Sequence, residues 1–280
     1  MQLWVTEKQT DSLCISFKVK EILHQEQTEF QHLAIVDTEQ YGRMLLLDGV
    51  VQTTIDDEFV YHEMMAHVPM LTHPEPKKVA VIGGGDGGSI RELLKHPSVE
   101  EATLVEIDGR VIEASKEFLP EIAAGLSDPR VKIIVGDGIA HIAEMENYYD
   151  VILIDSTDPV GAAFGLFTEE FYANVYKALT AEGIMVAQTE SPFVNQDIIE
   201  RSFRGISQNF PVTELYLGCV PTYPGGLWSF TLGSKKHHPL EANWERADQL
   251  KTKYYTKEVH RAAFQLPPFV QEQLDRIVQK

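Results

Sequence analysis

Acidic side chains follow successive apolar runs of this chain. Asp86 lies inside a glycine-rich segment, residues 83–88 (GGGDGG). Glu106 follows the next apolar run, and Asp155 opens a segment with the sequence DSTDP. Carboxylates attract ammonium and sulfonium groups, whereas Asp86 would repel a pyrophosphate. These residue types therefore predict a site for a cationic organic ligand that includes a nucleoside without phosphates.

The glycine-rich segment matches a nucleotide-binding pattern. Gly83, Gly85 and Gly88 have the G-x-G-x-x-G spacing, which lets a backbone approach a ligand closely. Glu106 lies about twenty residues further on, where an acidic side chain can accept hydrogen bonds from both ribose hydroxyls. Asp137 follows another apolar run and could accept from the amine of adenine, although an Asp there could equally cap a helix.

Five carboxylates are expected at one edge of the fold: Asp86, Glu106, Asp137, Asp155 and Asp158. Their mutual repulsion would raise their pKa values unless a positive charge is present. Either a metal ion or an organic polycation could supply that charge. Carboxylate sites for Mg²⁺ usually work with substrate phosphates, which this loop disfavours. We therefore expect an organic dication or trication, and neither a metal nor a bound cofactor.

The composition excludes several classes of protein. The chain has 280 residues, with 24 Lys and Arg against 42 Asp and Glu, so its formal net charge is −18. Such a surplus argues against nucleic-acid binding, because phosphate backbones are held by Lys and Arg. Two cysteines are too few for a disulfide framework, and no apolar stretch approaches the roughly 20 residues that span a bilayer. We expect a cytoplasmic enzyme that contacts no membrane.

Most of the chain alternates between short apolar runs and helical patterns. The runs lie at residues 79–82, 102–105, 131–135, 151–154 and 184–188. Strands buried on both faces and separated by helices predict a doubly wound, mostly parallel sheet of the Rossmann-like, methyltransferase type. Residues 212–217 and 228–232 are expected to close the sheet, and the tail is expected to end in a surface helix.

The first part of the chain has a different pattern. Short alternating runs at residues 13–19, 32–37 and 43–47, separated by turn residues, predict a small all-β domain over residues 1–55. A helix is expected to begin at Asp56 or Asp57 and to end near Pro69. The catalytic domain is then assigned to residues 56–280. Because open parallel sheets bind ligands beyond the carboxyl ends of their strands, the acidic residues should meet there.

Taken together, these motifs resemble those of the spermidine synthase family of polyamine aminopropyltransferases. The resemblance extends to segments outside the sheet, at residues 47–52 (LDGVVQ), 57–63 (DEFVYHE) and 221–228 (PTYPGGLW). It implies transfer of an aminopropyl group from decarboxylated S-adenosylmethionine to putrescine, with release of methylthioadenosine. Small molecules are then the partners, and the family implies a homodimer or larger assembly.

The resemblance also implies residue roles. Asp155 would be the general base, with Tyr61 beside the attacking amine. The adenosyl group would contact Gln31, Glu106, Asp137 and Gly138. The aminopropyl chain and the diamine would contact Gln52, His62, Asp86, Asp158, Gln188 and Tyr223.

The sequence leaves other activities open. A methyltransferase that uses intact S-adenosylmethionine could share the sheet and Glu106, but would place the donor's carboxylate beside Asp86. An NAD-dependent oxidoreductase and a non-catalytic polyamine-binding protein are further options. After Asp158 the chain departs from the family pattern, with AAFG at residues 162–165. Cadaverine, agmatine or a longer polyamine could therefore replace putrescine.

Overall fold

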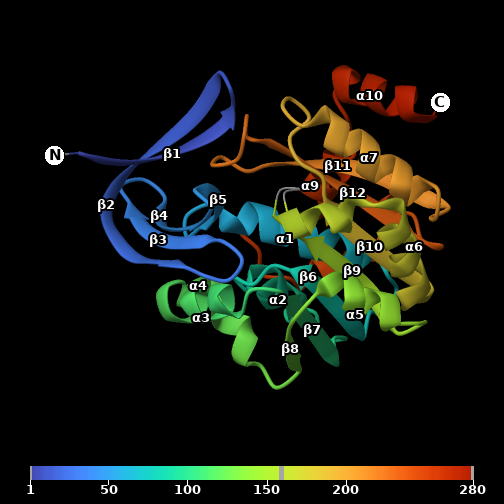
Figure 1. Ribbon diagram of the computed structural model, residues 1–280. Helices are drawn as coiled ribbons and strands as arrows, with labels where there is room; N and C mark the ends of the chain where they lie inside the picture. Colours follow the sequence, from blue (N-terminus) through green and yellow to red (C-terminus); the bar gives the residue numbers. More distant parts are fainter. Residues whose placement is uncertain (1, 158–160, 279–280) are drawn as a thin grey trace.

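The computed structural model describes residues 2–157 and 161–278, and two β-sheets organise them (Figure 1). The first sheet has five antiparallel strands in sequential order: β1 (Leu3–Thr10), β2 (Leu13–Gln27), β3 (His32–Thr38), β4 (Gly42–Leu47) and β5 (Val50–Thr54). The second sheet begins at Lys78. The predicted all-β N-terminal region is therefore present, while the exact domain boundary at residues 55 and 56 stays a prediction.

β2 is much longer than the strand predicted at residues 13–19. It continues to Gln27, and its pairing with β3 changes register between Val19 and Glu21 and again between Ile22 and His24. Each irregularity shifts the alternation of inward and outward side chains. The period-two pattern is therefore broken in the sequence although the strand continues.

The second sheet has seven strands in the order β11-β12-β10-β9-β6-β7-β8. Five are parallel: β6 (Lys78–Gly83), β7 (Glu101–Glu106), β8 (Val131–Val135), β9 (Tyr149–Asp155) and β10 (Leu179–Gln188). β11 (Val212–Cys219) and β12 (Leu227–Ser234) are antiparallel at one edge. The predicted fold class is confirmed. The strand order reverses between β6 and β9, so a crevice is expected beyond their carboxyl ends.

Helices cover the second sheet. They are α1 (Glu58–Thr72), α2 (Gly88–Leu93), α3 (Gly109–Phe118), α4 (Pro120–Ala123), α5 (Gly138–Glu144), α6 (Glu169–Ala178), α7 (Gln196–Ser207), α8 (Trp244–Ala247), α9 (Lys257–Ala263) and α10 (Pro268–Val278). Three short 3₁₀ helices are η1 (Ala124–Ser127), η2 (Gly161–Phe167) and η3 (Pro239–Glu241). None of the helices in the described ranges is long and apolar enough to cross a membrane.

The parallel strands separate two apolar cores. Along β6, Val79 and Val81 belong to one cluster, whereas Ala80 and Ile82 belong to the other. Because side chains alternate across a strand, a sheet covered on both faces needs a continuous apolar run. The N-terminal sheet is joined to the same body, since its Leu33 and Ile35 pack against Val111 of α3.

The predicted end of the first helix near Pro69 is wrong. α1 continues to Thr72 with Pro69 inside it, and all of its residues except Phe59 are buried. The proline removes one backbone hydrogen bond, but Thr72 Oγ1 and the His73 amide donate to the carbonyls of Val68 and Pro69. The carbonyls of Met70 and Leu71 in this last turn also accept from the Arg246 guanidinium and the Asn243 amide.

Candidate active site

A cavity of about 630 Å³ lies beyond the carboxyl ends of β6, β7 and β9, between the two sheets. The cavity is lined by every predicted site residue that the structure describes: Gln31, Gln52, Tyr61, His62, Asp86, Glu106, Asp137, Gly138, Asp155, Gln188 and Tyr223. Asp158 lies outside the described residues. Side chains separated by up to 192 positions in the sequence, from Gln31 to Tyr223, therefore share one cavity.

The glycine-rich loop makes room for a backbone carbonyl and for a side chain. Gly83 has a φ of +81°, and a Cβ there would collide with the carbonyl oxygen of Asp155. A Cβ at Gly88 would collide with the imidazole of His62. Glycine is tolerated at such positions because it lacks a Cβ and adopts positive φ without strain. The last glycine of the G-x-G-x-x-G pattern therefore accommodates a protein side chain.

Asp155 is held by two hydroxyl groups from different helices. The Tyr61 hydroxyl donates to Oδ1 at 2.7 Å, and the Ser89 hydroxyl donates to Oδ2 at 2.6 Å. Burial raises the pKa of Asp155, and the negative charge of Asp86 raises it further. Each carboxylate oxygen keeps a second lone pair, so Asp155 can accept another proton donor from the cavity.

Tyr61 acts as a hydrogen-bond donor in this arrangement. Burial raises its pKa well above the usual value, and the negative charge of Asp155 adds to the shift. The phenol therefore stays neutral and keeps its proton at physiological pH. Its ring packs edge-on against those of His62 and Tyr223, which orients the hydroxyl toward Asp155.

Asp86 lies beside His62 at the start of α2. His62 Nε2 is 3.3 Å from Oδ1 of Asp86, and the Gly88 amide donates to the same oxygen at 2.7 Å. Burial would raise the pKa of Asp86, but the charge and hydrogen bond of His62 outweigh it, so the pKa is lowered. The sequence-based expectation was that repulsion raises these pKa values unless a positive charge is present, and at Asp86 the imidazolium of His62 supplies that charge.

Glu106 faces the cavity at the end of β7. Its two oxygens accept from the Gly85 amide at 3.2 Å and the Asp108 amide at 2.9 Å. Burial raises the pKa of Glu106 to about 7, despite these two hydrogen bonds. Gln31 donates to Asp108 at 3.0 Å, which places it next to Glu106. Both side chains line the cavity.

Asp137 has the predicted capping role and also faces the cavity. It is the N-cap of α5 and accepts from the Ile139 amide at 2.8 Å, and it also lines the cavity together with Gly138. A carboxylate has about four acceptor positions, so capping leaves capacity for a ligand amine.

The far end of the cavity is built from three separate segments. The Tyr223 hydroxyl donates to the Gln52 carbonyl at 2.6 Å. Asp57, the N-cap residue of α1, accepts from the amide and hydroxyl of Thr222 at 3.0 and 2.7 Å. Gln188, at the end of β10, donates to Oε1 of Glu190 at 3.1 Å. These contacts fix the Tyr223 loop against β5 and α1.

Sequence reasoning missed several polar residues at the site, including Ser89, Glu190 and Glu58. Ser89 holds Asp155, Glu190 lines the cavity beside Gln188, and Glu58 contacts His62. The spacing of Glu58 and His62, four positions apart on a predicted helix, is the signal that could have revealed their contact. Ser89 contacts Asp155 across 66 positions of the sequence, for which the sequence offers no comparable signal, whereas Glu190 lies only two positions after the predicted Gln188.

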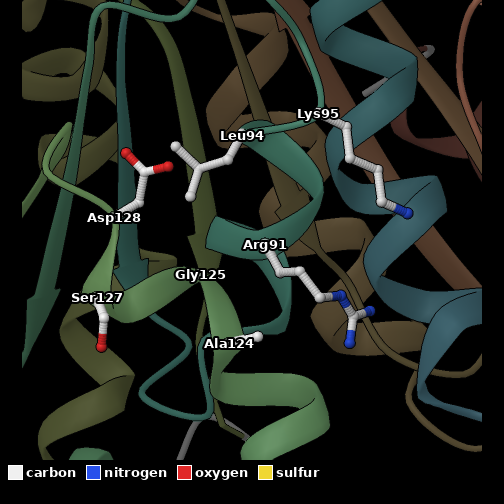
Figure 2. Close-up of a pocket in the computed structure, with 7 residues that line it drawn as sticks. All are labelled: Arg91, Leu94, Lys95, Ala124, Gly125, Ser127 and Asp128. Carbon is white, nitrogen blue, oxygen red and sulfur yellow. The ribbon is translucent and has the colours of Figure 1, made fainter.

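A second hollow, of about 480 Å³, lies beside α2 and η1 and is lined by none of the predicted site residues (Figure 2). Its two cationic residues already have anionic partners. Lys95 contacts Glu92 at 2.5 Å, and Arg91 contacts Glu58 at 2.7 Å. The cavity beyond the parallel strands is therefore the candidate active site.

The comparisons with known proteins agree with this geometry. The family model of the spermine/spermidine synthase domain matches residues 58–243, and that of the spermidine synthase tetramerisation domain matches residues 3–54. The chain belongs to the spermine/spermidine synthase family. The predicted family and the predicted class of enzyme, a transferase of the polyamine aminopropyltransferase type, are thereby confirmed.

Relatives match over nearly the whole chain. A polyamine aminopropyltransferase of Moorella thermoacetica is 59% identical over 273 residues, covering 98% of this chain and 96% of that protein. One from Bacillus subtilis is 58% identical over 271 residues, covering 97% and 98%.

Solved structures also match over nearly the whole chain, at lower sequence identity. A spermidine synthase in complex with the transition-state analogue AdoDATO has a TM-score of 0.96 and 44% identity, with 98% of this chain and 95% of that chain covered. Spermidine synthase from Thermotoga maritima has a TM-score of 0.93 and 43% identity, with 98% and 94% covered. The individual residue roles, the lack of a metal or cofactor and the cytoplasmic location stay predictions.

Proposed function

We propose that this protein transfers the aminopropyl group of decarboxylated S-adenosylmethionine to putrescine, yielding spermidine and methylthioadenosine. The observation that carries the proposal is the pair of buried carboxylates in one cavity. Asp155 is held by two hydroxyl donors, and Asp86 is held beside His62. Glu106 and Asp137, the proposed hydrogen-bond acceptors for a nucleoside, line the same cavity.

The donor would lie along the carboxyl edge of the parallel strands. Glu106 accepts from the two ribose hydroxyls, and Asp137 accepts from the adenine amine. Asp86 binds the ammonium of the aminopropyl chain, since its lowered pKa keeps it ionised. A pyrophosphate would be repelled by Asp86, which favours this donor over a dinucleotide.

The acceptor would occupy the end lined by Gln52, Gln188 and Tyr223. Its nitrogen attacks the methylene next to the sulfonium. The new C–N bond forms as the C–S bond breaks, and the electron pair goes to sulfur. The leaving group is a neutral thioether and needs no proton.

The nucleophile needs help from the protein, because an alkylamine with a pKa near the lysine value of about 10.4 arrives protonated at neutral pH. Asp155 takes that proton, and Tyr61 and Ser89 keep the carboxylate aimed at the amine. Alignment of nitrogen, carbon and sulfur can contribute several kcal/mol to the rate.

Product analysis tests the proposal. The purified protein is incubated with decarboxylated S-adenosylmethionine and, separately, putrescine, cadaverine, agmatine or spermidine, and the products are identified by mass. Equimolar spermidine and methylthioadenosine are expected with putrescine. Turnover with one of the other amines, and none with putrescine, would identify that amine as the acceptor. A methylated product from intact S-adenosylmethionine, or amine binding without turnover, would contradict the reaction.

We also propose that the chain forms a homodimer or larger homo-oligomer through its N-terminal sheet. β1 is an edge strand, and Leu3 and Trp4 on it are 44% and 51% exposed. Unpaired edge strands with apolar side chains are suited to pairing with another chain. Solution scattering should give the mass of a dimer or a multiple of it, and a monomeric mass would overturn the proposal.

A further inference from the structure

We infer that Glu58 is a positioning residue of the donor-ammonium site, because it holds His62 as an imidazolium that in turn orients Asp86. The inference rests on the proposed function, since it concerns how that site binds its cationic donor. It differs from the role expected for His62 from the sequence, which was direct contact with the diamine.

The geometry around the imidazole carries the inference. Both ring nitrogens face a carboxylate: Nδ1 is 2.6 Å from Oε2 of Glu58, and Nε2 is 3.3 Å from Oδ1 of Asp86. A neutral imidazole has one N–H, so one of the two carboxylates would then face a lone pair. The arrangement is satisfied when both nitrogens carry protons. His62 then has no lone pair with which to accept from an ammonium group.

Because His62 and Glu58 are buried, their charges must be paired. The side chains of His62 and Glu58 are 2% and 5% exposed. A buried charge is tolerated when it is paired and hydrogen-bonded. Burial alone would lower the pKa of His62, but Asp86 and Glu58 outweigh it and raise the pKa to about 10. The ring is also confined sterically by Gly88, where a Cβ would collide with it.

Arg91 supports Glu58 from the other side. Its guanidinium extends from α2 toward α1, at the edge of the second hollow (Figure 2), and donates to Oε2 of Glu58 at 2.7 Å. Burial would raise the pKa of Glu58, yet the pKa is lowered because His62 and Arg91 outweigh burial. A line of alternating charges thus runs from Arg91 through Glu58 and His62 to Asp86.

The charged groups around His62 and its partner Glu58 come from four elements. Glu58 lies on the same helix, Asp86 lies in the β6–α2 loop, Asp155 ends β9, and Arg91 lies on α2. Replacing Glu58 by Gln removes one negative charge but keeps an acceptor for Nδ1. The pKa of His62 should therefore fall, and its neutral form should leave Nε2 without a proton toward Asp86.

The experiment compares wild type with Glu58→Gln, Arg91→Gln and the exposed control Glu170→Gln. The protonation of His62 is followed by NMR of the ring carbon, with His62→Gln used to assign the signal. Glu58→Gln should bring the His62 titration into the range of about pH 7 to 9. Across that range its KM for the decarboxylated donor should rise by about tenfold, as expected for loss of one hydrogen bond to a charged group, with kcat nearly constant.

Arg91→Gln shows whether the effect of Glu58→Gln comes from the lost charge of Glu58 or from a general disturbance of the folded protein. Without Arg91 the negative charge of Glu58 is less compensated, so His62 should stay protonated across the same range, as in wild type and Glu170→Gln. The same His62 titration in Glu58→Gln as in wild type would overturn the inference while wild-type turnover upholds the function. If the wild type shows no turnover, the proposed function fails, and the NMR titration of the Glu58→Gln variant still decides the charge of His62.

Discussion

Two aspartates of one cavity have opposite electrostatic environments. The pKa of Asp86 is lowered because His62 lies against it, whereas the pKa of Asp155 is raised because burial and the charge of Asp86 prevail. A permanently ionised carboxylate suits the binding of an ammonium group. A carboxylate with a raised pKa suits the acceptance of a proton. In the proposed reaction, Asp86 would bind the ammonium group and Asp155 would take the proton.

Asp155→Asn tests the role of the base. An amide cannot take the proton of the amine, so turnover should fall by about 10²- to 10⁴-fold, the usual contribution of general-base catalysis. Binding of methylthioadenosine, measured by calorimetry, should stay close to the wild-type value because that product has no amine to deprotonate. Near-normal turnover would exclude Asp155 as the base.

Asp86→Asn tests recognition of the donor's ammonium. The variant should bind decarboxylated S-adenosylmethionine at least about tenfold more weakly, since a charged hydrogen bond is lost. Methylthioadenosine lacks that ammonium and is the matched control ligand. Equal losses for both ligands in calorimetry would contradict the assignment.

The ionisation of Glu106 predicts a pH dependence of nucleoside binding. The pKa of Glu106 in the folded protein is raised from 4.5 to about 7, so the side chain is mostly protonated at pH 6 and mostly ionised at pH 8. In the proposed site, the ionised form would accept hydrogen bonds from both ribose hydroxyls. The affinity for methylthioadenosine should therefore be about tenfold higher at pH 8 than at pH 6.

The raised pKa of Glu106 also makes the stability of the folded protein depend on pH. A raised carboxyl pKa means that the folded state binds the proton more tightly than the unfolded state. The stabilisation from protonated Glu106 is therefore present below about pH 4.5 and is lost as the pH rises to about 7. In Glu106→Gln, nucleoside binding should be weak and independent of pH. A flat pH profile in wild type would rule out Glu106 as the group responsible.

At the scale of elements, the site depends on the close approach of strand ends and helix starts. β6 ends at Gly83, beside the carbonyl of Asp155 at the end of β9. The start of α1 is tied to the Tyr223 loop by Asp57 and Thr222. The positions of the side chains in the candidate active site are therefore determined by where backbones approach each other.

A pair of glycines separates the effect of backbone strain from that of close packing. Gly83 and Gly49 both have a φ of +81°, but a Cβ at Gly49 has no neighbour within 4 Å. Gly49→Ala should lower the free energy of unfolding by about 1–2 kcal/mol, the strain of a left-handed conformation. Gly83→Ala should cost more and should also reduce turnover, because β9 must move. Equal losses in denaturant unfolding would show that strain alone matters.

At the scale of the molecule, the two sheets contribute to one cavity inside a strongly acidic protein. Glu7 of β1 and Gln52 of β5 line it from the N-terminal sheet, and Asp155 and Gln188 from the other. The net charge of −18 surrounds a site that is proposed to receive cations. Like-signed surface charge of this kind raises the rate of encounter with ligands of opposite sign.

Salt should therefore affect charged and uncharged ligands differently. Raising the ionic strength from about 0.05 M to about 0.5 M shortens the range of electrostatic attraction, so kcat/KM for the cationic substrates should fall several-fold. The affinity for neutral methylthioadenosine should change by less than about twofold. A kcat/KM that does not respond to salt would remove long-range attraction as a factor.

The sequence by itself determined the parallel sheet and the edge at which the site lies. Apolar runs such as residues 79–82 and 151–154 can be buried on both faces only in a covered sheet. The carboxyl ends of parallel strands meet at one edge, so the residues that follow them, Asp86, Glu106 and Asp155, had to lie close together. Both inferences need only local pattern and the geometry of strands.

The tertiary structure alone decided which charges pair and how far some elements extend. The contacts of Ser89 with Asp155, of Arg91 with Glu58 and of Asp57 with Thr222 join segments that are 33 to 165 positions apart. The last turn of α1 continues past Pro69 with hydrogen bonds from Arg246 and Asn243. Pairing free energies of this kind depend on distance and burial in three dimensions, and local sequence patterns do not encode either quantity.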